Sequence, residues 1–273
     1  MLKEEFLKAL IAEDVGRGDL FARISTSKPI RAYIIAKSDG VFAGQEYVAT
    51  FAKMYDLSLE WHVQDGEEFK KGEKLLFISG DSKMILSLER SILDMVLHAS
   101  SIATLTAQYV DAIKDTSVKL LDTRKTRPLL RAFEKYAVRC GGGINHRMGL
   151  DDCLMLKDTH LKTIDDLDAF MKEVRQKIPF TSKVEIECES MEMVQRAMKA
   201  GADIVMCDNM TLEETKEAVA YRDENYPHIL LEASGNVTLE TIGEIAATGV
   251  DAISSGSVIH QANWIDLSMR VEA

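Results

Sequence analysis

The chain lacks several features that would each point to a definite class of protein. Its 33 lysines and arginines are outnumbered by 44 aspartates and glutamates, which gives a net charge of −11. Nucleic-acid binding needs a dominant basic surface, so this balance argues against it. No apolar run approaches the roughly 20 residues that a membrane span requires. The N-terminal stretch MLKEEFLKALIAED mixes acids among its apolar residues, so we expect no signal peptide.

Closely spaced cysteines are also missing. The four cysteines, Cys140, Cys153, Cys188 and Cys207, lie far apart and form no C-x-x-C pair. This spacing favours reduced thiols over disulfides or a zinc site. We therefore expect a cytoplasmic protein, with no nucleic acid and no membrane among its partners.

The first hundred residues have the pattern of a mixed α and β module. An amphipathic helix is predicted from Leu2 to Ala12 because its apolar residues recur at helical spacing. Short strand candidates follow, RAYIIAK, DGVFAG, LSLEWHV and KLLFISG, with Gly and Asp at the turns. Helices are predicted at 45–55 and at 82–113. The Ala, Ser and Thr content of the long second helix suggests close packing against another element.

The rest of the chain alternates apolar β-rich segments with helix-forming segments. The strand candidates are VKLLD, CLMLKD, KVEIEC, DIVMCD, HILLEASG and VDAISSG. Near-continuous apolar strands separated by helices are typical of parallel βα units buried on both faces. Six units are fewer than the eight of a closed barrel, so we predict an open, incomplete α/β barrel.

Every predicted barrel strand ends in a polar or charged side chain. These ends are Asp122, Lys157, Glu187, Asp208, Glu232 with Ser234, and Ser254 with Ser255. The carboxyl ends of barrel strands converge on one rim, where active sites lie. The series therefore predicts a site at this rim.

A block of positive charge, LLDTRKTRPLLRAFEKYAVRCGGGINHRMGL, follows the first barrel strand. Arg124, Lys125, His146 and Arg147 flank turns in it, and arginine suits paired carboxylate or phosphate oxygens. The three glycines would let the backbone approach a ligand closely. A lone histidine such as His146 is often structural, but its position beside Arg147 keeps a binding role open.

The same block predicts a helix that begins at Pro128, which suits a first helical position. Arg131, Lys135 and Arg139 follow at four-residue steps and so share one helix face. We interpret this stripe as a solvated face rather than as part of the site.

The acids Glu187 and Asp208 end neighbouring strands. Two carboxylates together with substrate phosphates are a common way to hold Mg²⁺. The alternative is that they pair with Lys157 and the arginines in a charge network. The last two units end in ASGN and SSGS, which suit phosphate-binding loops after the final strands of a barrel.

Taken together, these motifs resemble quinolinate phosphoribosyltransferase over almost the whole chain. The resemblance is carried by DTRKT, EKYAVRCGGGINHRMGL, LKDTHL, VEIE, CDN, EASGN and SSGSVIH, and by AEDVGRGD and ERSILDMVLHASSIATLT nearer the start. It implies an N-terminal α/β sandwich domain at 1–105, a catalytic barrel at 106–257 and a C-terminal helix at 258–273 that packs back on the first domain.

The resemblance also implies an activity. Quinolinate and phosphoribosyl pyrophosphate would give nicotinate mononucleotide, pyrophosphate and CO₂, a step of de novo NAD synthesis. Mg²⁺ would be the cofactor. The enzyme would be a homodimer, or a hexamer built of dimers, in which Arg90 reaches the neighbouring subunit's site.

The same resemblance assigns roles to residues of this chain. Lys125, Lys157, Glu187 and Asp208 would be catalytic, and Glu187 and Asp208 would serve the metal and the ribose hydroxyls. The two quinolinate carboxylates would be held by Arg124, His146, Arg147 and Lys157, with Lys125 nearby. The 5-phosphate would be surrounded by Ser234, Gly235, Asn236, Ser255, Gly256 and His260.

A few positions depart from the family's usual pattern. Ser101 replaces a glycine, Thr159 stands in K-D-T-H where K-D-N-H is common, and SSGSVIH replaces S-V-G-A-L-T-H. Arg127 is also unusual and could add a cation at the mouth. Two alternatives stay open: an enzyme of the same fold with another anionic acceptor, and a silent module that binds a phosphorylated metabolite.

Overall fold

The computed structural model describes residues 3–272, which form two compact units. Unit 1 comprises the described parts of Met1–Ala107, Arg127–Gly142 and Gln261–Ala273. Unit 2 comprises Gln108–Thr126 and Gly143–His260. The expected division put all of 106–257 in one domain, whereas here the segment Arg127–Gly142 is part of unit 1.

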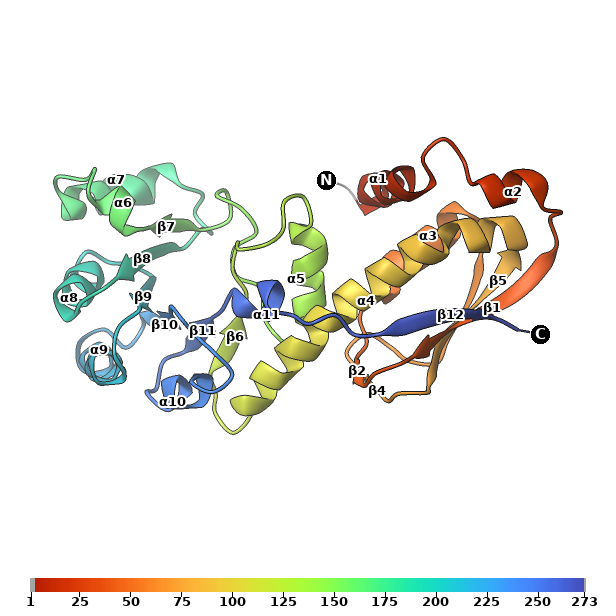
Figure 1. Cartoon of the computed structure of the whole chain (residues 1–273). Coiled ribbons are helices and arrows are strands. Elements are labelled where there is room, and N and C mark those ends of the chain that lie inside the picture. Colours follow the sequence, from red (N-terminus) through yellow and green to blue (C-terminus); the bar gives the residue numbers. More distant parts are fainter. Residues whose placement is uncertain (1–2, 273) are drawn as a thin grey trace. The chain divides into compact units, whose positions relative to one another are not determined.

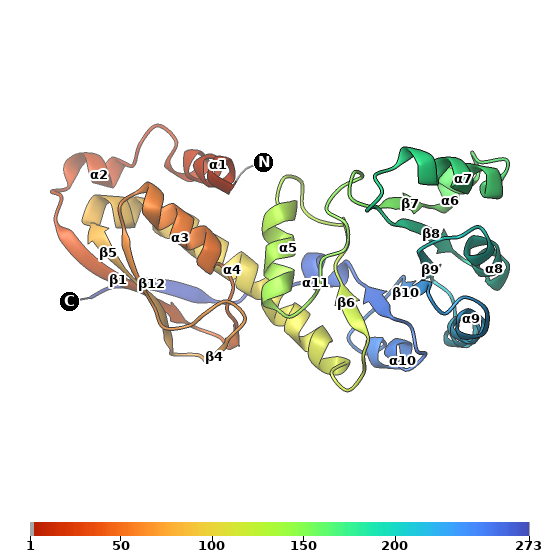
Figure 2. The same cartoon turned by 180° about the vertical axis from the view of Figure 1, so that it is seen from behind.

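Unit 1 is built on a four-stranded antiparallel sheet of order β12-β1-β5-β3 (Figure 2). Its elements are α1 (Lys3–Val15), α2 (Leu20–Ile24), β1 (Pro29–Ala36), β2 (Gly40–Val41), α3 (Gln45–Met54), β3 (Ser58–Trp61), β4 (Glu68–Phe69), β5 (Lys74–Asp81), most of α4 (Ser82–Ala112), α5 (Arg131–Cys140) and β12 (Leu267–Val271). In β1, Ala32, Ile34 and Ala36 are fully buried while the residues between them are not. This period of two gives the sheet one core face.

The C-terminal segment corrects the sequence prediction. A helix was expected over 258–273, but the helix α11 is confined to Ser257–His260, and Leu267–Val271 is the strand β12. Its Leu267 and Met269 are buried and Ser268 between them is not, which is a strand period. The segment pairs antiparallel with β1, whose edge would otherwise be open.

Helix α5 also differs from its prediction. It begins at Arg131 rather than at Pro128, because Leu129 has a positive φ of 66° that interrupts a helix. Lys135 is fully buried whereas Arg139 is exposed, so the stripe is a solvated face only in part. The reason is packing within unit 1: Phe133 lies 4.8 Å from Tyr47, ring centroid to ring centroid.

Helix α4 packs closely, as its small residues predict. Ser100 Oγ accepts the N–H of Ala43 at 3.0 Å and donates to the carbonyl of the same residue at 3.1 Å. Ser101 Oγ accepts the N–H of Ile265 at 2.9 Å, so this departure from the family pattern anchors the C-terminal segment. Although α4 has 31 residues, no helix among residues 3–272 is both long and apolar enough to cross a membrane.

Unit 2 is an open parallel barrel (Figure 1). Its further elements are β6 (Lys119–Leu121), β7 (Leu154–Leu156), α6 (Asp158–Leu161), α7 (Leu167–Lys177), β8 (Val184–Cys188), α8 (Met191–Lys199), β9 (Ile204–Asp208), α9 (Leu212–Asn225), β10 (Leu230–Ser234), α10 (Ile242–Ala246), β11 (Ala252–Ser254) and α11. The sheet order is β6-β11-β10-β9-β8-β7. Since β6 and β7 follow each other in the chain yet form opposite edges, the barrel is open between them, and the predicted architecture is confirmed.

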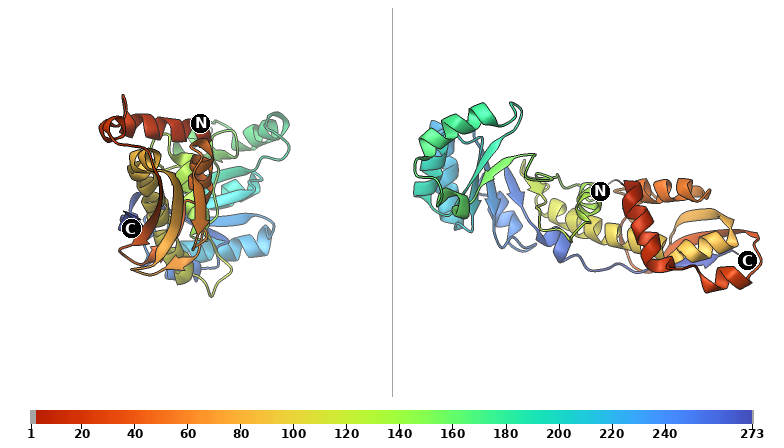
Figure 3. Two further views of the ribbon diagram at one scale, coloured as in Figure 1. Left: turned by 90° about the vertical axis from the view of Figure 1, so that its right-hand side faces the viewer. Right: turned by 90° about the horizontal axis from the view of Figure 1, so that it is seen from above.

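Each of the helices α7, α8 and α9 begins at a capping side chain. Asp166 accepts the N–H of Ala169, Ser190 that of Met193, and Thr211 that of Glu214. Such caps satisfy N–H groups that the first helical turn leaves unbonded. The helices lie on the outer side of the curved sheet (Figure 3). The strand ends therefore face a rim that is formed by loops.

Two of the buried serines of α4, Ser91 and Ser101, provide a test of this packing. Ser101→Ala removes the acceptor of the Ile265 N–H and should lower the free energy of unfolding by about 1–2 kcal/mol. Ser91 is equally buried in the same helix, but its hydroxyl has no partner. Ser91→Ala should therefore be neutral or stabilising. Urea unfolding followed by circular dichroism measures both, and equal losses would contradict the anchoring role of Ser101.

Candidate active site

A pocket of about 450 Å³ opens at the carboxyl ends of the strands of unit 2. Strand ends and the loops after them supply its wall, as the barrel pattern predicts. Its lining residues are Thr123, Arg124, Lys125, His146, Arg147, Met155, Lys157, Glu187, Met206, Asp208, Asn209, Ser234, Gly235, Asn236 and Ser254. Cations, acids and small loop residues therefore share one cavity.

Most of the residues predicted for the site line this cavity, and four do not. Ser255 is buried, and its hydroxyl bonds to the carbonyl of Val237 at 3.4 Å. Gly256 lies against the site, because a Cβ added to it would be 3.1 Å from Lys125 Cδ and 3.3 Å from the ring of His260. Arg90 belongs to α4 in unit 1 and forms an ion pair with Asp94 at 3.2 Å.

The turn that carries His146 and Arg147 is held by the buried carboxylate of Asp122. This carboxylate accepts the N–H of His146 at 2.8 Å and the side-chain amide of Asn145 at 2.6 Å. Ile144 pairs with Leu121 in a parallel bridge that extends the β6 edge. The residues after the three glycines are therefore fixed at the mouth of the barrel.

Arg147 is the most enclosed cation of the pocket. Its Nη1 donates to the carbonyl of Cys153 at 3.0 Å, and its Nη2 lies 3.4 Å from the sulfur of Met155. Only 9% of the residue is exposed. A guanidinium held in this way loses little side-chain entropy when it binds a carboxylate.

The two acids of the pocket lie on the neighbouring strands β8 and β9. Glu187 forms an ion pair with Lys157, and Asp208 accepts the side-chain amide of Asn209 at 3.0 Å. The donor set suits Mg²⁺, which is commonly held by one or two carboxylates and takes its other ligands from water and phosphates. The alternative of a charge network is also partly present, in the Lys157–Glu187 pair.

The loops after β9 and β10 pack tightly against each other. Gly235 has a positive φ of 95°, and a Cβ there would lie 2.8 Å from the backbone nitrogen of Asn209. Asn236 donates to the side-chain oxygen of Asn209 at 3.2 Å. Only glycine fits at position 235, and the loop backbone is thereby exposed to the cavity without a side chain in front of it.

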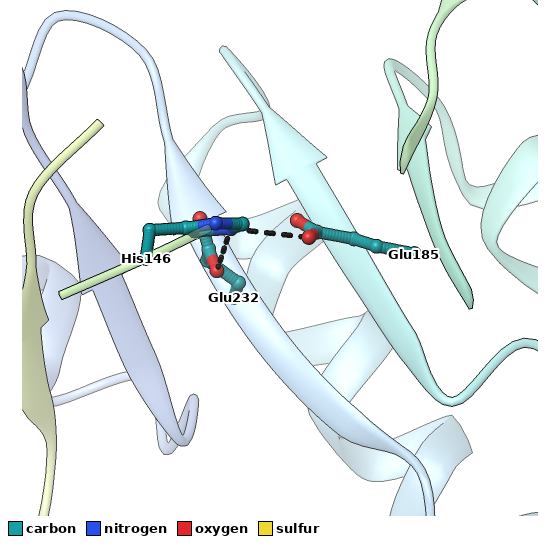
Figure 4. Close-up of side chains that lie close together, drawn as sticks. All are labelled: His146, Glu185 and Glu232. Carbon is teal, nitrogen blue, oxygen red and sulfur yellow. Dashed lines mark ion pairs between the residues drawn. The ribbon is translucent and has the colours of Figure 1, made fainter. Parts of the chain in front are cut away.

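His146 lies between two acids inside the barrel, Glu185 of β8 and Glu232 of β10 (Figure 4). Its Nε2 is 3.1 Å from Glu185 Oε2 and 3.3 Å from Glu232 Oε2. Burial lowers the pKa of His146, but the two carboxylates outweigh burial and raise it to about 10. Burial also raises the pKa of Glu185.

Sequence reasoning missed four residues of the cavity wall, Thr123, Met155, Met206 and Asn209, and it also missed the buried Glu185. A usable signal was present in VEIEC, because residues two apart on a strand share a face. With Glu187 on the cavity side, Glu185 had to face the barrel interior as well.

Arg127 does not line the pocket. It is part of unit 1, where its Nη1 donates to the buried carboxylate of Glu134 at 2.6 Å. His98 Nε2 lies 3.0 Å from the same carboxylate. Burial raises the pKa of Glu134, but His98 and Arg127 outweigh it, so that the pKa stays below its ordinary value. The suggestion that Arg127 adds a cation at the mouth is therefore wrong.

Comparisons with known proteins agree with this geometry. Two family models match, the N-terminal domain of quinolinate phosphoribosyl transferase over residues 19–100 and its C-terminal domain over residues 102–270. A relative from Synechocystis, named probable nicotinate-nucleotide pyrophosphorylase [carboxylating], is 39% identical over 98% of this chain and 92% of its own. A Bacillus subtilis protein of the same name is 37% identical over 98% of this chain and 93% of its own.

Solved structures give the same result. The crystal structure of NadC from Streptococcus pyogenes has a TM-score of 0.92 and 36% identity, covering 98% of this chain and 96% of that one. The nicotinate-nucleotide pyrophosphorylase of Francisella tularensis has a TM-score of 0.92 and 32% identity, covering 100% and 98%. The chain therefore belongs to the quinolinate phosphoribosyl transferase family.

Proposed function

We propose that the chain transfers the phosphoribosyl group of phosphoribosyl pyrophosphate to quinolinate, with loss of CO₂, to give nicotinate mononucleotide and pyrophosphate. This reaction is a step of de novo NAD biosynthesis. The observation that carries the proposal is that several cations and two acids line one cavity in a member of this family. A dicarboxylate and a diphosphate sugar need these two kinds of group.

Quinolinate would occupy the cationic part of the cavity. Arg124, Lys125, Arg147 and Lys157 all line it, and guanidinium groups pair well with carboxylate oxygens. Two adjacent carboxylates can engage several of these cations at once. A cavity that is partly closed to water strengthens such contacts.

Phosphoribosyl pyrophosphate would occupy the acidic part together with Mg²⁺. Glu187 and Asp208 would hold the ion and bind the ribose hydroxyls, and the bound ion would neutralise charge on the departing pyrophosphate. The loops at Ser234–Asn236 and Ser255–Gly256, with His260, would surround the 5-phosphate. The nearness of Lys125 supports this, because its Cδ would lie 3.1 Å from a Cβ added at Gly256, so a lysine side chain runs beside that loop.

The chemistry follows from this arrangement. As the bond from ribose to pyrophosphate breaks, the sugar gains positive charge, which the nearby carboxylates of Glu187 and Asp208 stabilise. The pyridine nitrogen of quinolinate forms the new bond to the sugar and becomes positively charged. The ring then accepts the electron pair of the bond to the adjacent carboxylate, which leaves as CO₂, and a proton takes its place on the ring carbon.

Arg90 suggests that the site is completed by a second copy of the chain. Its guanidinium is largely exposed, and its only described ion pair, to Asp94, is a surface pair on one helix turn. Such pairs contribute little stability and are easily exchanged for another partner. We propose a homodimer, or a hexamer built of dimers, in which Arg90 reaches the neighbouring site. The four free cysteines support a reducing, cytoplasmic location.

The activity makes a first prediction. Purified protein should consume quinolinate only with phosphoribosyl pyrophosphate and Mg²⁺, and should release CO₂ and nicotinate mononucleotide in equal amounts. Nicotinate should be a poor substitute, because its single carboxylate leaves cations of the cavity unpaired. Mass spectrometry of the products decides this, and comparable turnover of nicotinate would rule out the assignment.

A second prediction separates the two parts of the cavity. Arg147→Ala should weaken quinolinate binding by about 2–5 kcal/mol, because a buried partner of a carboxylate is lost. Asp208→Ala should leave quinolinate binding nearly intact but greatly reduce turnover, because this acid serves Mg²⁺ and the ribosyl diphosphate. Calorimetry with quinolinate alone tests both variants. If both lost affinity equally, the cavity would be one coupled charge network.

A third prediction concerns Arg90. Arg90→Ala and Arg147→Ala should each be inactive, but a mixture should regain part of the activity, because one kind of hybrid site contains both native residues. Subunit exchange is verified by mass spectrometry of differently labelled chains. Exchange without recovery of activity would show that Arg90 acts within its own chain.

A further inference from the structure

His146 uses both of its ring nitrogens inside the protein. Its Nδ1 accepts the backbone N–H of Arg147 at 2.7 Å, and its Nε2 faces Glu185 and Glu232. Only 10% of its side chain is exposed. The ring thus borders the cavity, but neither nitrogen is available to a carboxylate of the substrate.

Glu185 and Glu232 are unusual acids for the interior of a barrel. They are 0% and 2% exposed; Oε2 of each acid faces His146 Nε2, whereas Oε1 of each has no hydrogen-bond partner. Buried carboxylates without full compensation are costly, so a position with no further role would favour an apolar residue. The group within ion-pair distance that the two acids share is His146.

A metal ion is the first alternative to consider for this cluster. Ligand atoms of His146, Glu185 and Glu232 all lie within 4.8 Å of one another. However, Nδ1 accepts an N–H and must carry a lone pair, so the ring proton is on Nε2. A protonated Nε2 has no lone pair for a metal. A proton rather than a metal therefore lies between the three side chains.

The two acids and the backbone N–H of Arg147 both favour a ring proton on Nε2 of His146. The two acids raise the pKa of the ring and so favour a second proton, which would have to be on Nδ1. The N–H of Arg147 opposes that second proton, because two hydrogens would then meet across 2.7 Å. The form that satisfies both sides has its proton on Nε2 and its lone pair toward Arg147.

We propose that Glu185 and Glu232 are positioning residues for substrate recognition: they hold the Nε2–H of His146, and His146 Nδ1 in turn fixes the backbone of Arg147. The inference rests on the proposed function, in which Arg147 binds a quinolinate carboxylate. It changes the role expected of His146 from direct binding to support of Arg147. Arg147 is then held at two points: His146 accepts its backbone N–H, and Cys153 and Met155 contact its guanidinium group.

The test compares leucine and glutamine at the two acidic positions. The double variant Glu185→Leu/Glu232→Leu leaves His146 Nε2 without an acceptor. The KM for quinolinate should then rise roughly 10–100-fold, because a small misplacement of a binding group such as Arg147 has an effect of this size. The kcat and the KM for phosphoribosyl pyrophosphate should change less than about threefold. Glu185→Gln and Glu232→Gln keep an acceptor oxygen, so their KM for quinolinate should stay close to that of the wild-type protein.

Glu134 provides the matched control. It is another fully buried carboxylate facing a histidine, His98, but it is in unit 1 and does not line the cavity. Glu134→Gln should lower the melting temperature without changing the KM for quinolinate. An equal rise in quinolinate KM for this control would mean that any loss of a buried acid disturbs the site, and it would overturn the proposal.

The remaining outcomes distinguish the proposal from its alternatives. A wild-type chain that does not consume quinolinate contradicts the proposed function, whereas normal wild-type turnover with unchanged KM in the leucine variant contradicts the positioning role alone. One equivalent of tightly bound metal, lost with Glu185→Leu, would support a metal site instead. Nitrogen-15 NMR of the wild-type imidazole needs no variant: a proton on Nε2 is expected, and the Nδ1–H tautomer would overturn the proposal.

Discussion

All strands of the barrel run in one direction, and this constraint determines where the chemistry of the protein can be. In a parallel sheet every carboxyl end opens on the same rim, so side chains from distant parts of the sequence meet there. Lys157, Glu187, Asp208 and Ser234 come from four different strand ends and share one cavity. A single sheet geometry therefore assembles groups that no local segment could bring together.

The cavity combines charges of opposite sign without neutralising itself. Lys157 pairs with Glu187, yet other cations and Asp208 still line the same space. In a chain with a net charge of −11, this local group of cations is what can attract a small dianion.

Residues 3–272 contain two buried carboxylate–histidine clusters of similar composition and different consequence. In unit 1, Glu134 is compensated by His98 and by the guanidinium of Arg127, and its pKa stays low. In unit 2, Glu185 and Glu232 share one imidazole, and the pKa of Glu185 is raised. Burial and the neighbouring negative charge of Glu232 raise the pKa of Glu185. Among these residues Glu134 has no such acid beside it, and it accepts hydrogen bonds from both the side chain and the backbone of Arg127. The first cluster can thus be understood as packing, whereas the second acts on a ring that borders the cavity.

Apolar runs, turn residues and polar strand ends in the sequence predicted the open barrel, the long helix α4 and most of the cavity wall. These features depend on local periodicity and on strand direction, which a sequence contains. The sequence did not reveal that Lys135 is buried or that Arg127 binds Glu134, because both depend on which elements pack against α5. It also did not reveal that Leu267–Val271 pairs with β1, since a short segment takes the form that its partner edge offers. The interior role of Glu185 was decided by tertiary structure for the same reason: only the closing of β8 and β10 around His146 brings the three side chains together.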